Sequence, residues 1–253
     1  MATTSVTVAE TPHAAALLRL ADDALILGHR TSEWTGRAPM LEEELALANI
    51  ALDLIGQARA LYDAAGALLG LTEDQLAYLR DPHQFRNALI HELPNGDFAF
   101  SISRLVLVSA FSDLFWRSAT ASSDAVLAAI AAKAEKETAY HLRHSAAWLV
   151  RLGDGTPESH RRAQDAIDAL WPYTGELFEV DETMVAAGVL PDPAPLRAAW
   201  DNTVGETLAS ATLTRPADGW MQSGGRQGRH TEHLGHLLAE MQVLPRTHPG
   251  ATW

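Results

Sequence analysis

Apolar residues recur at steps of three and four along almost the whole 253-residue chain, which is the spacing of one face of an α-helix. We find no segment with the alternation of a β-strand, no internal repeat and no linker that would separate two domains. The sequence therefore predicts one all-α domain over residues 1–253, a four-helix bundle with additional helices, with about residues 1–13 disordered. The predicted helices span about residues 14–29, 39–69, 75–79, 98–115, 125–152, 159–178, 195–213 and 231–244.

Two local signals mark helix boundaries. Asp97 follows a Pro-Asn-Gly turn and is predicted to cap the helix that starts after it. Pro172 is expected to kink or end the helix predicted over 159–178, because proline lacks the N–H that a helix interior needs.

Charge and cysteine content exclude several classes of function. The chain has 19 Lys and Arg against 32 Asp and Glu, a formal net charge of −13, which argues against nucleic acid and against an anionic membrane as partners. Cysteine is absent, so disulfides, thiolate metal sites and cysteine nucleophiles are excluded. No apolar run approaches the roughly 18 residues of a membrane span, and no secretory signal is visible, so a cytoplasmic protein is predicted.

Polar residues interrupt the apolar faces of two predicted bundle helices. His141 points inward on the fourth long helix, and we favour a buried histidine hydrogen-bonded to Glu137 over a metal ligand or proton carrier. Asn49, Asp53 and Gln57 follow one another at four-residue steps on the second helix. This line is more typical of a solvated face or an interhelical hydrogen-bond ladder than of a ligand or base.

The C-terminal region carries a histidine-dense segment after a glycine-rich loop. His230 comes just before the last predicted helix, in which Glu232, His236 and Glu240 share one face and His233 lies beside them. A zinc or iron site there is weighed against capping and surface roles, which we favour. In the preceding loop, Arg226 and Arg229 suggest either anion binding through backbone N–H groups or, as we favour, a contact with another protein.

Eight blocks of the sequence carry a resemblance to a known family: 32–39 (SEWTGRAP), 45–59 (LALANIALDLIGQAR), 94–99 (PNGDFA), 140–143 (YHLR), 151–156 (RLGDGT), 196–200 (LRAAW), 230–235 (HTEHLG) and 238–242 (LAEMQ). Together they resemble the family of non-catalytic subunits, designated C, of bacterial phenylacetyl-CoA epoxidases. The resemblance implies a ferritin-like fold and a place in the monooxygenase of aerobic phenylacetate breakdown. In that complex the related catalytic subunit holds a di-iron centre and epoxidises the ring with O₂, and a reductase with FAD and an iron–sulfur cluster supplies electrons from NADPH.

The resemblance also implies where a di-iron site would lie. Such a bundle uses a Glu from each of two helices and a Glu-x-x-His pair from each of two others. The predicted-helix glutamates at 42–44, 135, 137 and 232 have no histidine three residues later. Alignment with the catalytic relative places one pair on Leu54 and Gln57 and the other on Thr138 and His141, so only one of the four ligands is retained.

The resemblance, with these ligand positions lost, therefore implies a metal-free structural subunit that binds and stabilises the di-iron subunit in a hetero-oligomer with other epoxidase subunits. We expect the second long helix and residues 230–242 to contribute to the interface. Two alternatives stay open. One is an oxygenase with an unorthodox ligand set of Glu137, His141, Asp53 and Glu232, and the other is a CoA- or anion-binding module that uses the two arginines of the glycine-rich loop.

Overall fold

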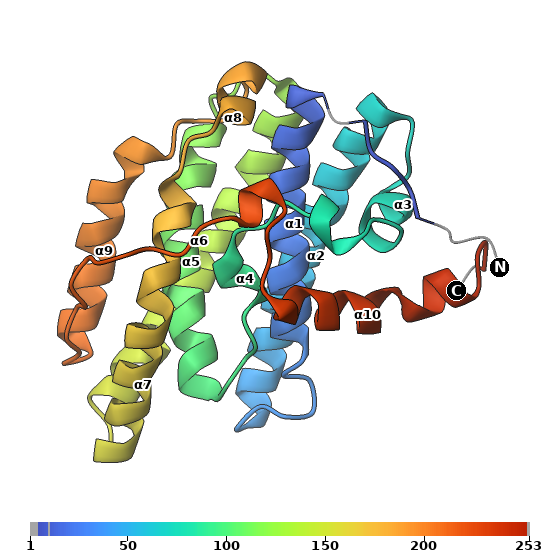
Figure 1. Cartoon of the computed structure of the whole chain (residues 1–253). Helices are drawn as coiled ribbons and strands as arrows, with labels where there is room; N and C mark the ends of the chain where they lie inside the picture. The colour runs from blue at the N-terminus through green and yellow to red at the C-terminus, as the bar shows by residue number, and fades with distance from the viewer. Residues whose placement is uncertain (1–4, 10, 252–253) are drawn as a thin grey trace.

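The computed structural model describes residues 5–9 and 11–251, and these contain helices and turns but no β-strand (Figure 1). The predicted all-α class is thus confirmed. The helices are α1 (Pro12–Ser32), α2 (Leu41–Leu69), α3 (Glu73–Tyr78), α4 (Leu89–Glu92), α5 (Phe98–Ala119), α6 (Ala125–Gly153), α7 (Pro157–Leu170), α8 (Glu182–Ala187), α9 (Arg197–Ser210) and α10 (Glu232–Thr247), with 3₁₀ turns η1 (Pro82–Gln84), η2 (Trp171–Tyr173), η3 (Gly175–Phe178), η4 (Ala194–Leu196) and η5 (Gly225–Gln227).

Four long helices form the bundle. α1 packs along α2, α5 packs along α6, and α2 also contacts α6. Buried side chains occur all around α1 and α5, whereas α2 and α6 each keep a solvent-facing side. The two inner helices therefore supply most of the apolar core, and the two amphipathic ones close it from outside.

The remaining helices cover the bundle on two sides. α7 and α9 lie against α5 and α6, while α10 starts near α1, runs outward below α3 and contacts α3 and α4 (Figure 1). The segment between α9 and α10 runs back across the same face, where it meets the α4 region. This face therefore gathers residues from both ends of the sequence.

α5 corrects the expectation about apolar runs. By length and composition it could cross a membrane, with a mean hydropathy of 1.5, but 78% of that stretch is buried inside the protein. Arg104 and Asp113 interrupt the strictly apolar run without lowering the average enough. The central position of α5 in the bundle accounts for its composition.

Several helix boundaries differ from the prediction. α1 begins at Pro12 because the Thr11 side chain accepts a hydrogen bond from the Ala14 amide. The segment expected to be disordered lies partly outside the described residues, but Val6 is held as extended chain, its N–H donating to the Leu79 carbonyl at 3.0 Å. Asp97 caps α5 as predicted, and α7 ends at Leu170, two residues before the proline.

Candidate functional site

The aligned metal positions all lie inside the bundle. Leu54 and Gln57 on α2, and Thr138 and His141 on α6, are each at most 6% exposed. The Thr138 hydroxyl donates to the carbonyl of Ala134 in its own helix, at 2.9 Å. None of the four aligned positions therefore supplies a carboxylate to the interior of the bundle.

His141 has a different partner from the one expected. Its Nε2 lies 3.0 Å from Oδ2 of Asp53, across the gap between α6 and α2. Glu137 instead accepts a hydrogen bond of 2.8 Å from Gln57 and pairs with Lys133 at 3.2 Å. The polar line on α2 is therefore an interhelical hydrogen-bond ladder at Asp53 and Gln57.

The unorthodox ligand set does not assemble. Glu232 is exposed at the start of α10, whereas Glu137 and His141 face α2. Within residues 5–9 and 11–251, no three His, Asp or Glu side chains are grouped so that they could hold a metal ion. One Glu-x-x-His spacing falls at Glu10 and His13; Glu10 lies outside the described residues, and His13 pairs with the residue that caps α6.

A small cavity of about 40 Å³ lies between α1, α2 and α5, and both Leu54 and Gln57 line it. Asp23 and His91 are the only acidic or histidine side chains among its lining residues. The His91 Nδ1 lies 3.2 Å from Asp23 Oδ1, so these two groups face each other at the edge of the cavity. The other aligned positions, on α6, do not line it.

Arg226 reaches this cavity edge from the glycine-rich loop. Its guanidinium donates to both oxygens of Asp23, at 2.9 and 2.8 Å, and to the carbonyl of Arg86 at 2.9 Å. Its side chain is only 5% exposed. Arg226 is therefore occupied inside the protein, which argues against both the favoured contact of this residue with another protein and the alternative of binding an external anion.

The surrounding charges and burial determine the protonation states of Asp23 and His91. Burial alone would raise the pKa of Asp23, but the Arg226 charge and His91 beside it hold that pKa below its usual value. Burial lowers the pKa of His91, although Asp23 opposes that effect. At neutral pH this corner therefore contains one carboxylate, one guanidinium and a neutral imidazole.

The glycine-rich loop does bind an anion through its backbone, but the anion is part of the protein. Oε1 of Glu176, fully buried, accepts hydrogen bonds from the N–H groups of Gly224 and Arg226 at 3.0 and 3.2 Å. A Cβ on Gly225 would lie 2.2 Å from the Asn87 carbonyl oxygen, so glycine is needed for this close approach. The loop is a packing element against residues 83–89.

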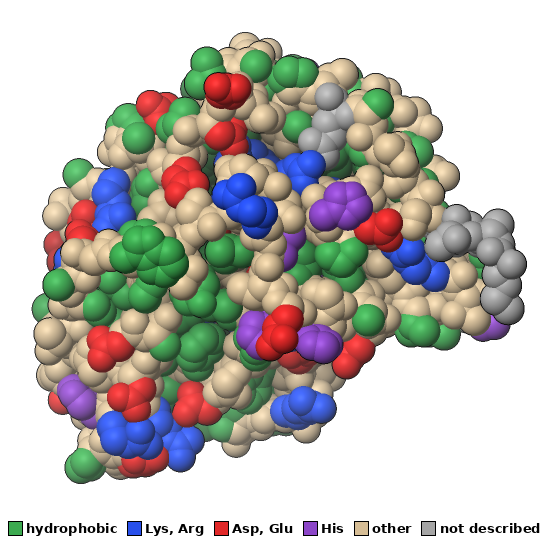
Figure 2. All heavy atoms as spheres, in the orientation of Figure 1, with side chains coloured by type: hydrophobic (Ala, Val, Ile, Leu, Met, Phe, Trp, Pro, Cys, Tyr) green, Lys and Arg blue, Asp and Glu red, His purple; other side chains and the backbone are tan. Residues whose placement is uncertain are grey.

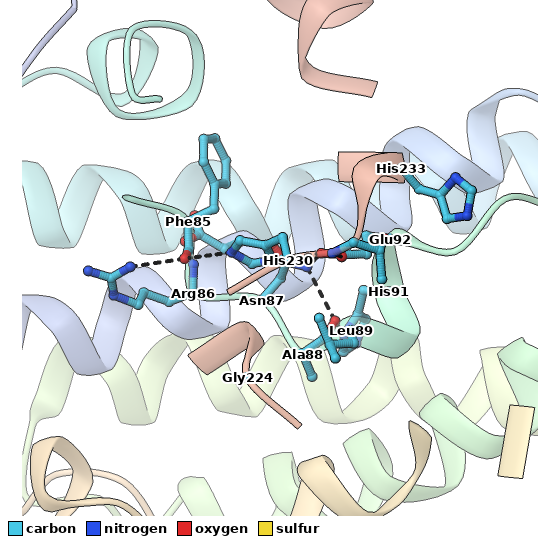
Figure 3. A network of polar contacts seen from close by, with 12 residues as sticks. Phe85, Arg86, Asn87, Ala88, Leu89, His91, Glu92, Gly224, His230 and His233 are labelled. Carbon is cyan, nitrogen blue, oxygen red and sulfur yellow. Dashed lines mark hydrogen bonds and ion pairs between the residues drawn. The ribbon is translucent and has the colours of Figure 1, made fainter. Parts of the chain in front are cut away.

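The histidine-dense segment is joined to α4 (Figure 3). His230 Nδ1 lies 2.7 Å from Oε2 of fully buried Glu92, and the Thr231 amide donates to the other oxygen at 2.6 Å. Burial alone would lower the pKa of His230, but its hydrogen bond to Glu92 and the Glu92 charge raise it. His233 points away from this network, and its carbonyl accepts a hydrogen bond from Arg30.

Arg229 is the exposed one of the two loop arginines, and its guanidinium donates a hydrogen bond of 3.4 Å to the Gln227 side chain. Figure 2 shows the surrounding face with acidic and basic side chains intermixed, and the coloured residues form no broad basic patch there.

Comparison with known proteins then identifies the family. A family model described as phenylacetic acid catabolic protein matches residues 1–253. The chain is also 49% identical to the subunit designated C of 1,2-phenylacetyl-CoA epoxidase from Escherichia coli K12 over 240 residues, covering 93% of this chain and 97% of that one. The chain belongs to the phenylacetic acid catabolic protein family. The resemblance stated from the sequence blocks is thus confirmed.

A solved structure supports the fold assignment of the family. Protein 19 from Synechococcus, which has aldehyde deformylating oxidase activity, matches with a TM-score of 0.57 at 19% identity, covering 90% of this chain and 99% of that one. At this identity the match bears on the fold alone, and it confirms the predicted ferritin-like class.

Sequence reasoning missed the buried acids that organise this region of the family fold. Asp23, Glu92 and Glu176 each stand beside or within an apolar run. A charged residue in such a run is almost never fully buried unless it is paired, so the search for a partner should have started there.

Proposed function

We propose that this chain is a non-catalytic subunit of a phenylacetyl-CoA epoxidase, and that it binds and stabilises the di-iron subunit in a cytoplasmic hetero-oligomer. The observation that carries the proposal is the chemistry at the aligned ligand positions. Leu54 has no donor atom, and Gln57 and Thr138 are neutral, with their side-chain donors committed to other groups. The fourth position, His141, is bound to Asp53.

The residues present do not fit a di-iron centre. Two irons need several anionic oxygen ligands and open positions, and the cavity beside Leu54 offers one carboxylate, that of Asp23. The guanidinium of Arg226 already chelates that carboxylate. A fixed positive charge 2.8 Å from the only available acid opposes the entry of a second cation.

The same residues support a scaffold role. Ion pairs and backbone contacts tie α1 to the α4 region and to the loop before α10, so the chain can hold its shape without metal. In the proposed complex, the di-iron subunit supplies the oxygen chemistry, and this chain supplies binding surface.

The expected interface segments differ in what they offer. In α10 the apolar side chains Leu234, Leu237 and Leu238 pack inside the chain itself, so residues 230–242 expose mainly polar groups. The exposed apolar residues of α10 come later, at Val243 and Leu244, which are 53% and 56% exposed. The end of α10 is therefore the part of this segment that we propose for a partner contact.

The test is iron content and turnover. The purified chain, loaded anaerobically with Fe²⁺ and desalted, is expected to retain no stoichiometric iron, whereas its complex with the di-iron subunit retains the iron of that subunit. The chain with reductase, NADPH, O₂ and phenylacetyl-CoA is expected to form no epoxide. Retention of about two irons per isolated chain, or turnover without the partner, contradicts the proposal.

A further inference from the structure

The solvent side of α2 carries an apolar strip. Leu41, Leu45 and Leu52 are 69%, 58% and 65% exposed, and half-buried Ala48 and Gly56 lie on the same side of the helix. We call these five residues the α2 strip. Exposed leucines scattered singly are ordinary, but a line of them on one helix side marks an interaction surface.

We propose that the α2 strip is the contact between two copies of this chain, with the two α2 helices antiparallel about a two-fold axis near Ala48. Such a contact uses the same residues on both sides. With the axis between positions 48 and 49, Leu45 of one copy meets Leu52 of the other, and Leu41 meets Gly56. The inference does not depend on the proposed function.

The shape of the strip fits this register. Gly56 is open, since a Cβ built there would meet only Lys133 Nζ, at 3.9 Å. The missing side chain leaves room for Leu41, the most exposed leucine of the strip. The bulky and the small end of the strip are therefore complementary when the second helix runs in the opposite direction.

The charges select the same direction. Glu42 and Glu44 lie in the first turn of α2, at the Leu41 end of the strip. Lys133 and Lys136 are the only two lysines of the chain, and both lie on α6. Lys133, which is 71% exposed and pairs with Glu137 of its own helix, lies beside Gly56. An antiparallel pair brings each acidic turn next to the lysines of the other copy, whereas a parallel pair brings like charges together.

This charge pattern is the reason for choosing a second copy as the occupant. Each copy carries both the acidic first turn of α2 and the α6 lysines, so a two-fold axis forms the same charge contact twice. The strip is about 22 Å long from Leu41 to Gly56, at 1.5 Å per residue, and one helix wide. With the α6 lysines added, the contact is at the small end of specific interfaces, so we expect a dissociation constant of about 1–100 µM.

The first experiment measures the mass of the full chain by sedimentation equilibrium between about 1 and 200 µM. We expect a monomer–dimer equilibrium. Leu45→Glu/Leu52→Glu is expected to raise the dissociation constant at least ~100-fold, because it places charges in the desolvated centre of the contact. The matched control is Val180→Glu/Val185→Glu, which alters two exposed apolar residues outside both the strip and the end of α10, and is expected to leave the equilibrium unchanged.

A charge exchange tests the direction of packing. Lys133→Glu/Lys136→Glu and Glu42→Lys/Glu44→Lys are each expected to weaken self-association at least ~10-fold, because each variant faces its own like charge. An equimolar mixture of the two is expected to restore the dimer, because the exchanged turns and lysines are again complementary. Thermal unfolding of each variant shows that it is folded.

Three results overturn the inference: a wild-type chain that stays monomeric at 200 µM, a dimer that the Leu45→Glu/Leu52→Glu variant leaves intact, or a mixture that remains monomeric. A chain monomeric alone, whose strip variant fails to bind the di-iron subunit, assigns the strip to that partner instead. That outcome rejects the self-contact and leaves the proposed function standing. Iron retention by the isolated chain contradicts the proposed function and leaves the self-contact standing.

Discussion

Removal of the Arg226 guanidinium tests the account of the buried corner beside the cavity. Arg226→Met keeps the length and apolar character of the side chain but leaves the Asp23 carboxylate without its bidentate partner. Removing one member of a buried pair costs about 3–5 kcal/mol, since the other charge is left without compensation. The carbonyl of Arg86 also loses a donor, which adds about 1 kcal/mol.

One effect opposes this cost. Burial and the neighbouring charge of Arg226 together lower the pKa of Arg19 to about 10, so the charged form of Arg19 is relieved of part of this penalty when Arg226 is removed. The net loss is therefore expected at about 3–5 kcal/mol of unfolding free energy, a large part of the stability of a typical domain.

The loss should depend on pH. In the wild type the pKa of Asp23 is below its usual value, so its contribution to stability is present above about pH 4 and is lost only as the pH falls through the lowered folded pKa. In Arg226→Met the dominant remaining influence on Asp23 is burial, which raises its pKa, so protonation on acidification relieves the buried charge. The variant should therefore lose less stability at about pH 5 than at about pH 8.

Urea unfolding followed by circular dichroism at both pH values measures these quantities. Arg229→Met is the matched control, because the same substitution at this exposed position of the same loop should change the unfolding free energy by less than about 0.5 kcal/mol. A cost below about 1 kcal/mol for Arg226→Met, or an equal cost at both pH values, refutes the reasoning.

Two further substitutions probe the neighbouring contacts. Glu92→Gln should lower the pKa of His230 in an NMR titration, because the ion pair that raises this pKa is lost. The stabilisation from that ion pair is complete below about pH 6.5 and disappears as the pH rises through the raised folded pKa, so the variant should lose more stability at about pH 6 than at about pH 9. The control, Glu232→Gln at an exposed position, should change neither the pKa of His230 nor the pH dependence of stability. Gly225→Ala should lower the unfolding free energy by ~1–3 kcal/mol, because its Cβ would lie 2.2 Å from a backbone oxygen. The control is Gly235→Ala within α10, whose Cβ would meet no atom within 4 Å, so this variant should be neutral or more stable by about 0.5–1 kcal/mol. An unchanged unfolding free energy for Gly225→Ala contradicts the packing account of the loop.

The bundle itself could be predicted because its signals are local. Helical spacing of apolar residues identified the long helices, and Asp97 marked the start of α5 where the structure has it. The short helices α4 and α8 were missed, since four and six residues are too few to establish a period. Their positions depend on contacts with distant parts of the chain, which no local pattern encodes.

The side-chain partners were predicted less well for the same reason. His141 was assigned to Glu137 because residues four apart lie on one side of a helix, yet the pairing depends on the packing of α2 against α6, which brings Asp53 to the imidazole. Arg226 was interpreted as a surface cation because it stands in a glycine-rich loop. Its burial follows from a tertiary contact with α1, about two hundred residues earlier in the chain.

The Arg226–Asp23 pair can finally be separated from the backbone contacts that it also provides. A buried pair replaced by apolar residues of similar volume is often neutral, so Asp23→Leu/Arg226→Met should be more stable than Arg226→Met alone. It should not reach the wild type, because Asp23 also accepts the Ala88 amide at 2.8 Å, and an unsatisfied buried N–H costs about 1–3 kcal/mol. The same urea titrations, arranged as a double-mutant cycle, measure the coupling. If the two single-variant costs simply add, the buried charge has been stabilised by other groups, and Arg226 is not what neutralises the one carboxylate beside the cavity.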